Sequence, residues 1–210
     1  MTGSVQEVSH PLIQTHLTRL RDKSTSPDVF RQLVGRLAVL LAYEATKDLE
    51  LDTGTVQTPL VETTGYSLKG RIGMVPILRA GLGMVDPILN LIPSAEVWHL
   101  GLYRDEETAQ PVRYYDKLPK SQPVDVALVV DPMLATGGSA IAALETLRDW
   151  GVPKLKLLSI IAAPEGTHEI AAKVPEADVY VCAIDEQLND QKFIVPGLGD
   201  AGDRTFNTLV

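Results

Sequence analysis

An acidic residue and a glycine-rich turn make the segment VVDPMLATGGSA, residues 129–140, a candidate anion site. The apolar run predicts a strand ending at Asp131, and the Thr-Gly-Gly-Ser turn at 136–139 is expected to open a helix. Glycines let backbone N–H groups approach a phosphate closely, hydroxyl groups add donors, and a helix start contributes positive potential. The ordinary alternative is a strand-to-helix turn in which Thr136 caps the helix.

Two further strand ends carry an arginine, whose planar cation suits phosphate oxygens. Arg79 follows the run GMVPIL and precedes Ala-Gly-Leu-Gly, a second candidate backbone nest, and Arg104 follows the run at 95–103. Each could instead be a solvent-facing arginine beside a turn. No lysine follows the glycines at 137–138, so the nucleotide P-loop pattern is excluded, and GxGxxG is also absent from this turn.

Apolar runs separated by helical segments predict the elements that position these residues. Residues 10–50 have helical spacing. Strands are expected at 55–63, 71–78, 95–103, 125–131, 154–163 and 178–184, and helices at 81–92, 137–150 and 164–174. Because several strands are apolar on both faces, an α/β fold with an open, mostly parallel sheet flanked by helices is predicted.

Composition limits the classes of protein that fit. The chain has 210 residues with 45% apolar content, so we expect one domain, 1–210, with a helical N-terminal flank at 1–50. A single cysteine excludes an intrachain disulfide, and no signal or membrane-spanning pattern is present, so a cytoplasmic, membrane-free protein is expected. The net charge of -8 disfavours nucleic-acid binding.

The C-terminal segment 185–210 contains Phe-Ile-Val-Pro-Gly-Leu-Gly-Asp-Ala-Gly-Asp-Arg at 193–204. With DPMLATGGS, PILRAGLGM and Arg104, this motif resembles the type I phosphoribosyltransferases, and uracil phosphoribosyltransferases in particular. Only the leading aromatic residue, Phe193, differs from the tyrosine usual in that family. The resemblance spans nearly the whole chain. It implies the type I phosphoribosyltransferase fold, with 185–210 as a C-terminal hood that binds the base.

The resemblance implies transfer of ribose 5-phosphate from phosphoribosyl pyrophosphate (PRPP) to uracil, giving UMP and diphosphate in pyrimidine salvage. It assigns catalytic roles to Arg79, Arg104, Asp131 and Asp200. It assigns PRPP binding to Arg79, Arg104, Asp131, Pro132, Met133, Leu134, Ala135, Thr136, Gly137, Gly138, Ser139 and Asp200. It assigns uracil binding to Ile194, Gly199, Asp200 and Ala201.

The implied chemistry needs charge stabilisation and positioning more than a strong base, because negative charge develops on the departing pyrophosphate. Mg²⁺ is expected to be bound mainly through that substrate, and no protein metal ligand is assigned. The resemblance also implies a homo-oligomer and makes GTP a candidate activator, with no residues to which it can be assigned. The peptide around Arg79-Ala80 is expected to be strained or cis.

Two other functions stay open. A phosphoribosyltransferase-like regulator that binds RNA would need a basic face, which the negative net charge disfavours. A transferase for another base is disfavoured by the C-terminal motif. Glycines there would let main-chain groups approach a uracil edge, and a cytosine amine would then face a backbone donor.

Overall fold

The computed structural model describes residues 3–104, 111–116, 118–119 and 121–208. Its main sheet is parallel throughout and contains seven strands. Their order is β1-β11-β10-β8-β4-β5, with β9 paired to β10. These strands are β1 (Val5–Glu7), β4 (Ile72–Pro76), β5 (Glu96–Val97), β8 (Val126–Val130), β9 (Met133–Leu134), β10 (Lys154–Ala162) and β11 (Asp178–Ile184).

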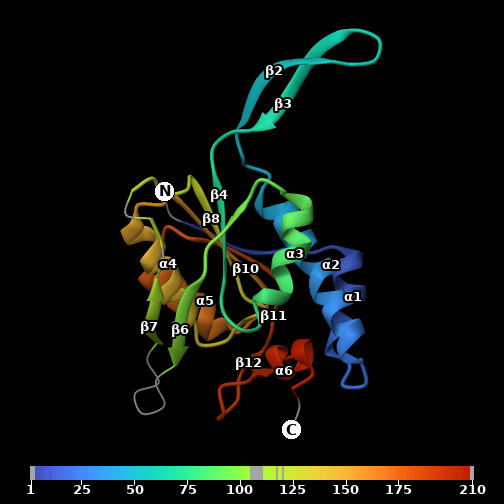
Figure 1. Cartoon of the computed structure of the whole chain (residues 1–210). Coiled ribbons are helices and arrows are strands. Elements are labelled where there is room, and N and C mark those ends of the chain that lie inside the picture. Colours follow the sequence, from blue (N-terminus) through green and yellow to red (C-terminus); the bar gives the residue numbers. More distant parts are fainter. Residues whose placement is uncertain (1–2, 105–110, 117, 120, 209–210) are drawn as a thin grey trace.

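Helices cover both faces of this sheet (Figure 1). One face holds α1 (Pro11–Arg21), α2 (Pro27–Ala45) and α3 (Leu82–Leu91), and the other holds α4 (Gly138–Trp150) and α5 (Pro164–Lys173). Two apolar clusters correspond to the two faces. All five residues of β8 are buried between them, which explains why that strand is apolar on both sides. The predicted fold class is confirmed.

Three antiparallel pairs lie outside the main sheet. They are β2 (Leu51–Gln57) with β3 (Glu62–Leu68), β6 (Leu100–Arg104) with β7 (Pro111–Asp116), and β12 (Gln187–Leu188) with β13 (Ile194–Val195). The short helix α6 (Ala201–Phe206) follows β13. The β2–β3 pair projects from one end of the molecule, and α6 and β12 lie at the opposite end (Figure 1).

Two strand predictions were wrong in detail. The run 55–63 is a hairpin and not one strand, because Thr58 turns the chain: its N–H donates to Val61 O at 3.0 Å, and its hydroxyl caps the turn. The run 95–103 is divided between β5 and β6, which belong to different sheets. The pattern also missed β1, whose edge pairing with β11 depends on a distant part of the chain.

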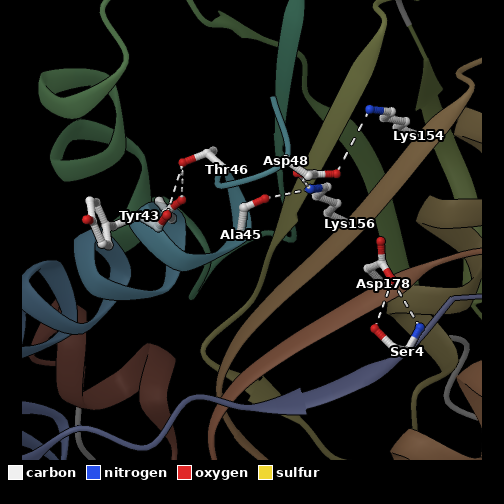
Figure 2. A network of polar contacts seen from close by, with 9 residues as sticks. Ser4, Tyr43, Ala45, Thr46, Asp48, Lys154, Lys156 and Asp178 are labelled. Carbon is white, nitrogen blue, oxygen red and sulfur yellow. Dashed lines mark hydrogen bonds and ion pairs between the residues drawn. The ribbon is translucent and has the colours of Figure 1, made fainter. Parts of the chain in front are cut away.

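A buried cation joins α2 to the sheet (Figure 2). Lys156 of β10 is 1% exposed, and its Nζ donates to Ala45 O at 2.6 Å and to Asp48. Ala45 is the last residue of α2 and Asp48 follows it, so the lysine fixes the helix end before the chain enters β2. A buried charge is tolerated because it is paired and hydrogen-bonded.

No helix in the described part of the chain is long and apolar enough to span a membrane. The single cysteine, Cys182, is 5% exposed in β11, and burial raises the pKa of its thiol to about 12. Cys182 is therefore a packing residue. Because α2, the sheet and α6 all contribute to one apolar cluster, we infer that 1–210 is a single domain.

Candidate functional site

The carboxyl ends of β4 and β8 bring two predicted phosphate-binding segments together. These strands are parallel neighbours, with Pro76 opposite Val130. Beyond the paired region, Ile77 N donates to Val130 O at 3.0 Å, and Asp131 N donates to Leu158 O of β10 at 3.1 Å. The loops that follow β4 and β8 therefore start side by side, where open α/β sheets bind ligands.

The first half of the loop after β8 is held by the sheet, and the second half leads into α4. Pro132 O accepts from Ile160 N and Ile161 N of β10, and Leu134 O accepts from the N–H of Ala163, the residue after β10, so the 132–134 segment is tied to the sheet. Gly137 then takes a φ of +82° at the start of α4. The first N–H groups of a helix have no partners within the helix, so the start of α4 offers the donors that the predicted phosphate site needs.

The loop rests on α5. A Cβ at Gly166 would lie 2.4 Å from Ala135 O, and one at Gly137 would lie 3.3 Å from Gly166 O. Gly166 therefore lets the loop lie against the first turn of α5. The sequence alone did not indicate this role for Gly166, because a supporting contact between separate segments has no local signal.

Asp131 is set at the base of this loop. Although some of its surface is exposed, loss of water around the carboxyl raises its pKa to about 7. Met133 N donates weakly to Asp131 Oδ1, at 3.4 Å, and opposes that shift. Strongly perturbed carboxyl groups at strand ends are typical of functional sites. The position fits its predicted role toward ribose hydroxyls.

Arg79 lies in the loop after β4, where Leu82 N donates to Arg79 O and Gly83 N donates to Ala80 O. The cis bond of this loop joins Leu78 and Arg79, one peptide before the predicted position. The Arg79 side chain is 61% exposed. It therefore remains accessible to a ligand at the loop.

Glycines 81 and 138 provide a matched pair of substitutions. A Cβ at Gly81 would lie 2.4 Å from Val130 O, whereas at Gly138 it would meet only Thr136 Oγ1, at 3.9 Å. We expect Gly81→Ala to destabilise the protein strongly, because main-chain atoms must shift. Gly138→Ala should keep the melting temperature near that of the unmodified protein but raise the KM for PRPP several-fold, because its methyl group would occupy space beside the phosphate. Thermal unfolding and steady-state kinetics test both. An unchanged KM in Gly138→Ala would remove that glycine from the site.

The C-terminal segment that includes α6 also contacts the Arg79 loop. A Cβ at Gly202 would lie 3.8 Å from Arg79 Nη2 and 4.0 Å from Ala80 Cβ, and one at Gly83 would lie 3.3 Å from Thr205 Cγ2. Two segments about 120 residues apart in the sequence thus meet at the predicted site. The structure brings Arg79 and Asp200 to one region, as the motifs predict.

Of the residues predicted to bind the base, two are buried and two are exposed. Ile194 and Ala201 are 7% and 0% exposed, with their side chains in the core cluster. Gly199 is exposed and has a φ of +76°, and Gly197 has a φ of +66°. A Cβ at Gly197 would lie 2.1 Å from Ile194 O, so this turn requires glycine.

Asp200 and Asp203 have different roles in the tail. Asp200 caps α6, since its Oδ1 accepts from Asp203 N at 2.9 Å. Asp203 Oδ1 lies 3.2 Å from Arg79 Nη2 and accepts from the Thr208 hydroxyl at 2.7 Å. The Thr208 hydrogen bond and, to a smaller extent, Arg79 hold the pKa of Asp203 below its usual range. Sequence reasoning missed this ion pair, because nothing local relates the two residues.

Arg104 is the last residue of β6, whose Leu100 end is buried beside α4. Its side chain lies outside the described residues. The role assigned to Arg104 therefore stays a prediction. Among the described residues, no group of three or more His, Cys, Asp or Glu side chains could hold a metal ion.

Comparison with known proteins gives the family. A family model for uracil phosphoribosyltransferase matches residues 7–208. A protein named uracil phosphoribosyltransferase from Roseiflexus castenholzii is 56% identical over 199 residues, covering 95% of this chain and 96% of the relative. A solved structure of the AQ2163 protein from Aquifex aeolicus is 39% identical, with a TM-score of 0.92, and covers 99% of this chain and 100% of its own.

The fold is shared more widely. A solved adenine phosphoribosyltransferase from Trypanosoma brucei has a TM-score of 0.56 at 10% identity, covering 93% of this chain and 88% of its own. That likeness concerns the fold alone. The family model, in contrast, extends through the C-terminal motif. The chain belongs to the uracil phosphoribosyltransferase family.

Proposed function

We propose that this protein transfers ribose 5-phosphate from PRPP to uracil and releases diphosphate. One observation carries the proposal: the glycine-rich tail at 197–202 meets the Arg79 loop, beside the loop that follows Asp131. A base held at the tail would therefore lie next to a sugar phosphate held at the strand ends. Proximity of this kind accounts for much of the rate gain in two-substrate reactions.

The roles proposed for the site residues follow from their charges and from those of the substrate groups. The turn at 135–139 holds the 5-phosphate through backbone donors, and Asp131 accepts hydrogen bonds from the ribose hydroxyls. Arg79 and Arg104 stabilise the pyrophosphate as it leaves. Charge stabilisation by fixed donors is usually the largest contribution to catalysis of such a step.

The proposed base contacts come from the main chain of Ile194, Gly199 and Ala201. The side chains of Ile194 and Ala201 belong to the core cluster, so a contact with the base would have to come from their backbone groups. Uracil has two carbonyl acceptors with an N–H between them, which suits alternating backbone donors and acceptors. A site built on such hydrogen bonds can reject a mismatched base by a factor on the order of 10⁴.

Magnesium fits the donor set as a partner of the substrate. Mg²⁺ in phosphate-transferring sites is commonly held by one or two carboxylates together with substrate phosphates. Asp131 and Asp200 are the acidic residues proposed for the PRPP site, so they are the carboxylates that would contact the ion. The ion would supply positive charge at the pyrophosphate.

A direct assay tests the proposal. The purified protein is mixed with PRPP, uracil and Mg²⁺, and UMP and diphosphate are quantified by chromatography, with EDTA and a reaction lacking uracil as controls. Equal amounts of UMP and diphosphate, abolished by EDTA, are expected. Absence of UMP at any Mg²⁺ concentration would contradict the proposed function, and activity unaffected by EDTA would contradict the proposed cofactor.

We also propose a cytoplasmic homo-oligomer. Leu60, Val61 and Tyr66 of the β2–β3 arm are 89%, 62% and 69% exposed, and a lone hairpin of this kind gains stability when another chain covers it. Light scattering during size-exclusion chromatography tests the oligomer, and a monomer at micromolar concentration would refute it. GTP as an activator also stays a proposal, tested by adding it to the same UMP assay.

A further inference from the structure

The turn that precedes Gly199 is held by charged groups from distant parts of the chain. Gly197 is contacted by an ion pair between Arg21, at the end of α1, and Asp185, just after β11. Gly197 N donates to Asp185 Oδ2 at 2.9 Å, and Arg21 Nη1 donates to Gly197 O at 2.7 Å. Both main-chain groups of this glycine are therefore fixed by one pair.

The pair is well enclosed. The side chain of Asp185 is 4% exposed and that of Arg21 is 23% exposed. Both terminal nitrogens of the Arg21 guanidinium, Nη1 and Nη2, face the carboxylate, with Nη1 at 2.7 Å from Asp185 Oδ2. Asp185 N donates to Ala162 O of β10 at 2.8 Å, which connects the pair to the main sheet. Bidentate, charge-assisted hydrogen bonds of this kind fix the relative orientation of the two side chains and are also stronger than neutral hydrogen bonds.

Arg204 holds Leu198, the residue that follows Gly197. Its Nη1 donates to Leu198 O at 2.7 Å and to Leu20 O at 2.8 Å, and its Nη2 donates to Asp22 O at 2.6 Å. The guanidinium also stacks on the Phe30 ring, with 4.3 Å between its central carbon and the ring centroid. One side chain thus joins the base-binding turn to α1 and α2.

We propose that Arg21, Asp185 and Arg204 are positioning residues that hold the 197–199 turn so that Gly199 can bind uracil. The inference rests on the proposed function and extends it, because none of the three need touch either substrate. We call these three residues the clamp. Through the clamp, the N-terminal helices α1 and α2 help to hold the turn that is proposed to bind the base. The clamp contacts the turn and not the phosphate loop, so its loss should affect the two substrates unequally.

Arg204→Lys provides the main test. Lysine keeps the positive charge and the aliphatic stem over Phe30, but one ammonium group cannot reproduce the planar fork that reaches three carbonyl groups. We expect the KM for uracil to rise at least about tenfold while the KM for PRPP changes less than about twofold. Discrimination between uracil and cytosine should also fall, which simple loss of stability would not cause.

Arg31→Lys is the matched control. Arg31 also reaches the tail from α2, and its Nη1 donates to Thr205 O at 2.9 Å, but it contacts α6 and not the 197–199 turn. This variant should show nearly unchanged KM values for both substrates. A parallel rise in the two KM values in both variants would overturn the proposal, since it would indicate general loosening of the tail.

Asp185→Asn keeps the test decisive if Arg204→Lys fails to fold. Asparagine retains the size of the side chain and an acceptor for Gly197 N but removes the charge that faces Arg21. The same selective rise in the KM for uracil is expected, and an unchanged KM for uracil would overturn the proposal. If the unmodified protein used a base other than uracil, the proposed function would be contradicted but the clamp would not. The clamp would then be tested by the KM for that other base.

Discussion

Arg79→Ala is expected to reduce kcat/KM by roughly 10² to 10³, corresponding to about 3 to 4 kcal/mol of lost transition-state stabilisation. The Arg79 side chain lies in the loop after β4 and is 61% exposed, so the substitution removes charge near the proposed position of the leaving group and not core packing. Its described ion pair with Asp203 is near the surface and contributes about 0 to 1 kcal/mol to stability. Circular dichroism and thermal unfolding should therefore show a nearly unchanged fold.

Asp203→Asn tests whether activity depends on the ion pair between Arg79 and Asp203 or on the charge of Arg79 itself. It breaks the same contact from the other side while Arg79 keeps its guanidinium, so the loss in kcat/KM should be much smaller than for Arg79→Ala. Arg79→Lys should be intermediate, since lysine retains a charge without the fork. Near-normal activity of folded Arg79→Ala would remove Arg79 from the assignment. Equal losses in the alanine and Asp203→Asn variants would show that the pair, and not the charge, is what matters.

Asp131→Asn should produce opposite changes in activity and stability. The carboxylate accepts two hydroxyl hydrogen bonds in the proposed site, and hydrogen bonds to a charged group contribute about 1.5 to 3 kcal/mol each. We therefore expect kcat/KM for PRPP to fall at least about tenfold at pH 8. The variant should nevertheless unfold at a higher temperature than the unmodified protein at that pH.

The sign of the stability change follows from the raised pKa. Asp131 has a pKa of about 7 in the folded protein, against an ordinary value of 3.8. Between these values the folded state binds more protons than the unfolded state, so stability falls as pH rises through this window. Asparagine carries no charge and avoids this loss, which is on the order of a few kcal/mol above pH 7. The difference between the two proteins should vanish near pH 4.

The pH profile gives an independent readout of the same group. In the unmodified protein, kcat/KM for PRPP should rise up to about pH 7 and then level off, because the free enzyme needs the ionised carboxylate. In Asp131→Asn that rise should disappear. A retained rise near pH 7 in the variant would assign it to another group, and greater stability of the unmodified protein at pH 8 would contradict the desolvation of Asp131.

The sequence allowed prediction of those parts of the molecule that local patterns determine. The β8 run and the Thr-Gly-Gly-Ser turn indicate a buried strand followed by a helix, and the structure has β8 and α4 there. The β2–β3 arm was misread because its apolar residues, such as Leu60, suggested one continuous strand, although they lie at the surface of a hairpin. Apolar spacing indicates that a segment tends to be buried, but it does not show which part of the protein, or which other chain, buries it.

Contacts between distant segments could not be predicted in the same way. Arg21 and Asp185 are 164 positions apart, and Arg79 and Asp203 are 124 apart. A single sequence contains no signal that relates the members of either pair. The motifs therefore indicated which segments form the candidate site, whereas the residues that hold those segments in place became visible only when the strand order and the position of α6 were known.

Base selectivity tests the central claim most directly, because the claim is that the glycine-rich tail forms a uracil site beside a PRPP site. We would measure diphosphate release from PRPP and Mg²⁺ with uracil, cytosine, adenine, guanine and hypoxanthine, and compare kcat/KM. Uracil is expected to exceed each of the others by a factor on the order of 10⁴, because a mismatched base leaves buried backbone groups unpaired. Comparable turnover of cytosine or of a purine would contradict the account.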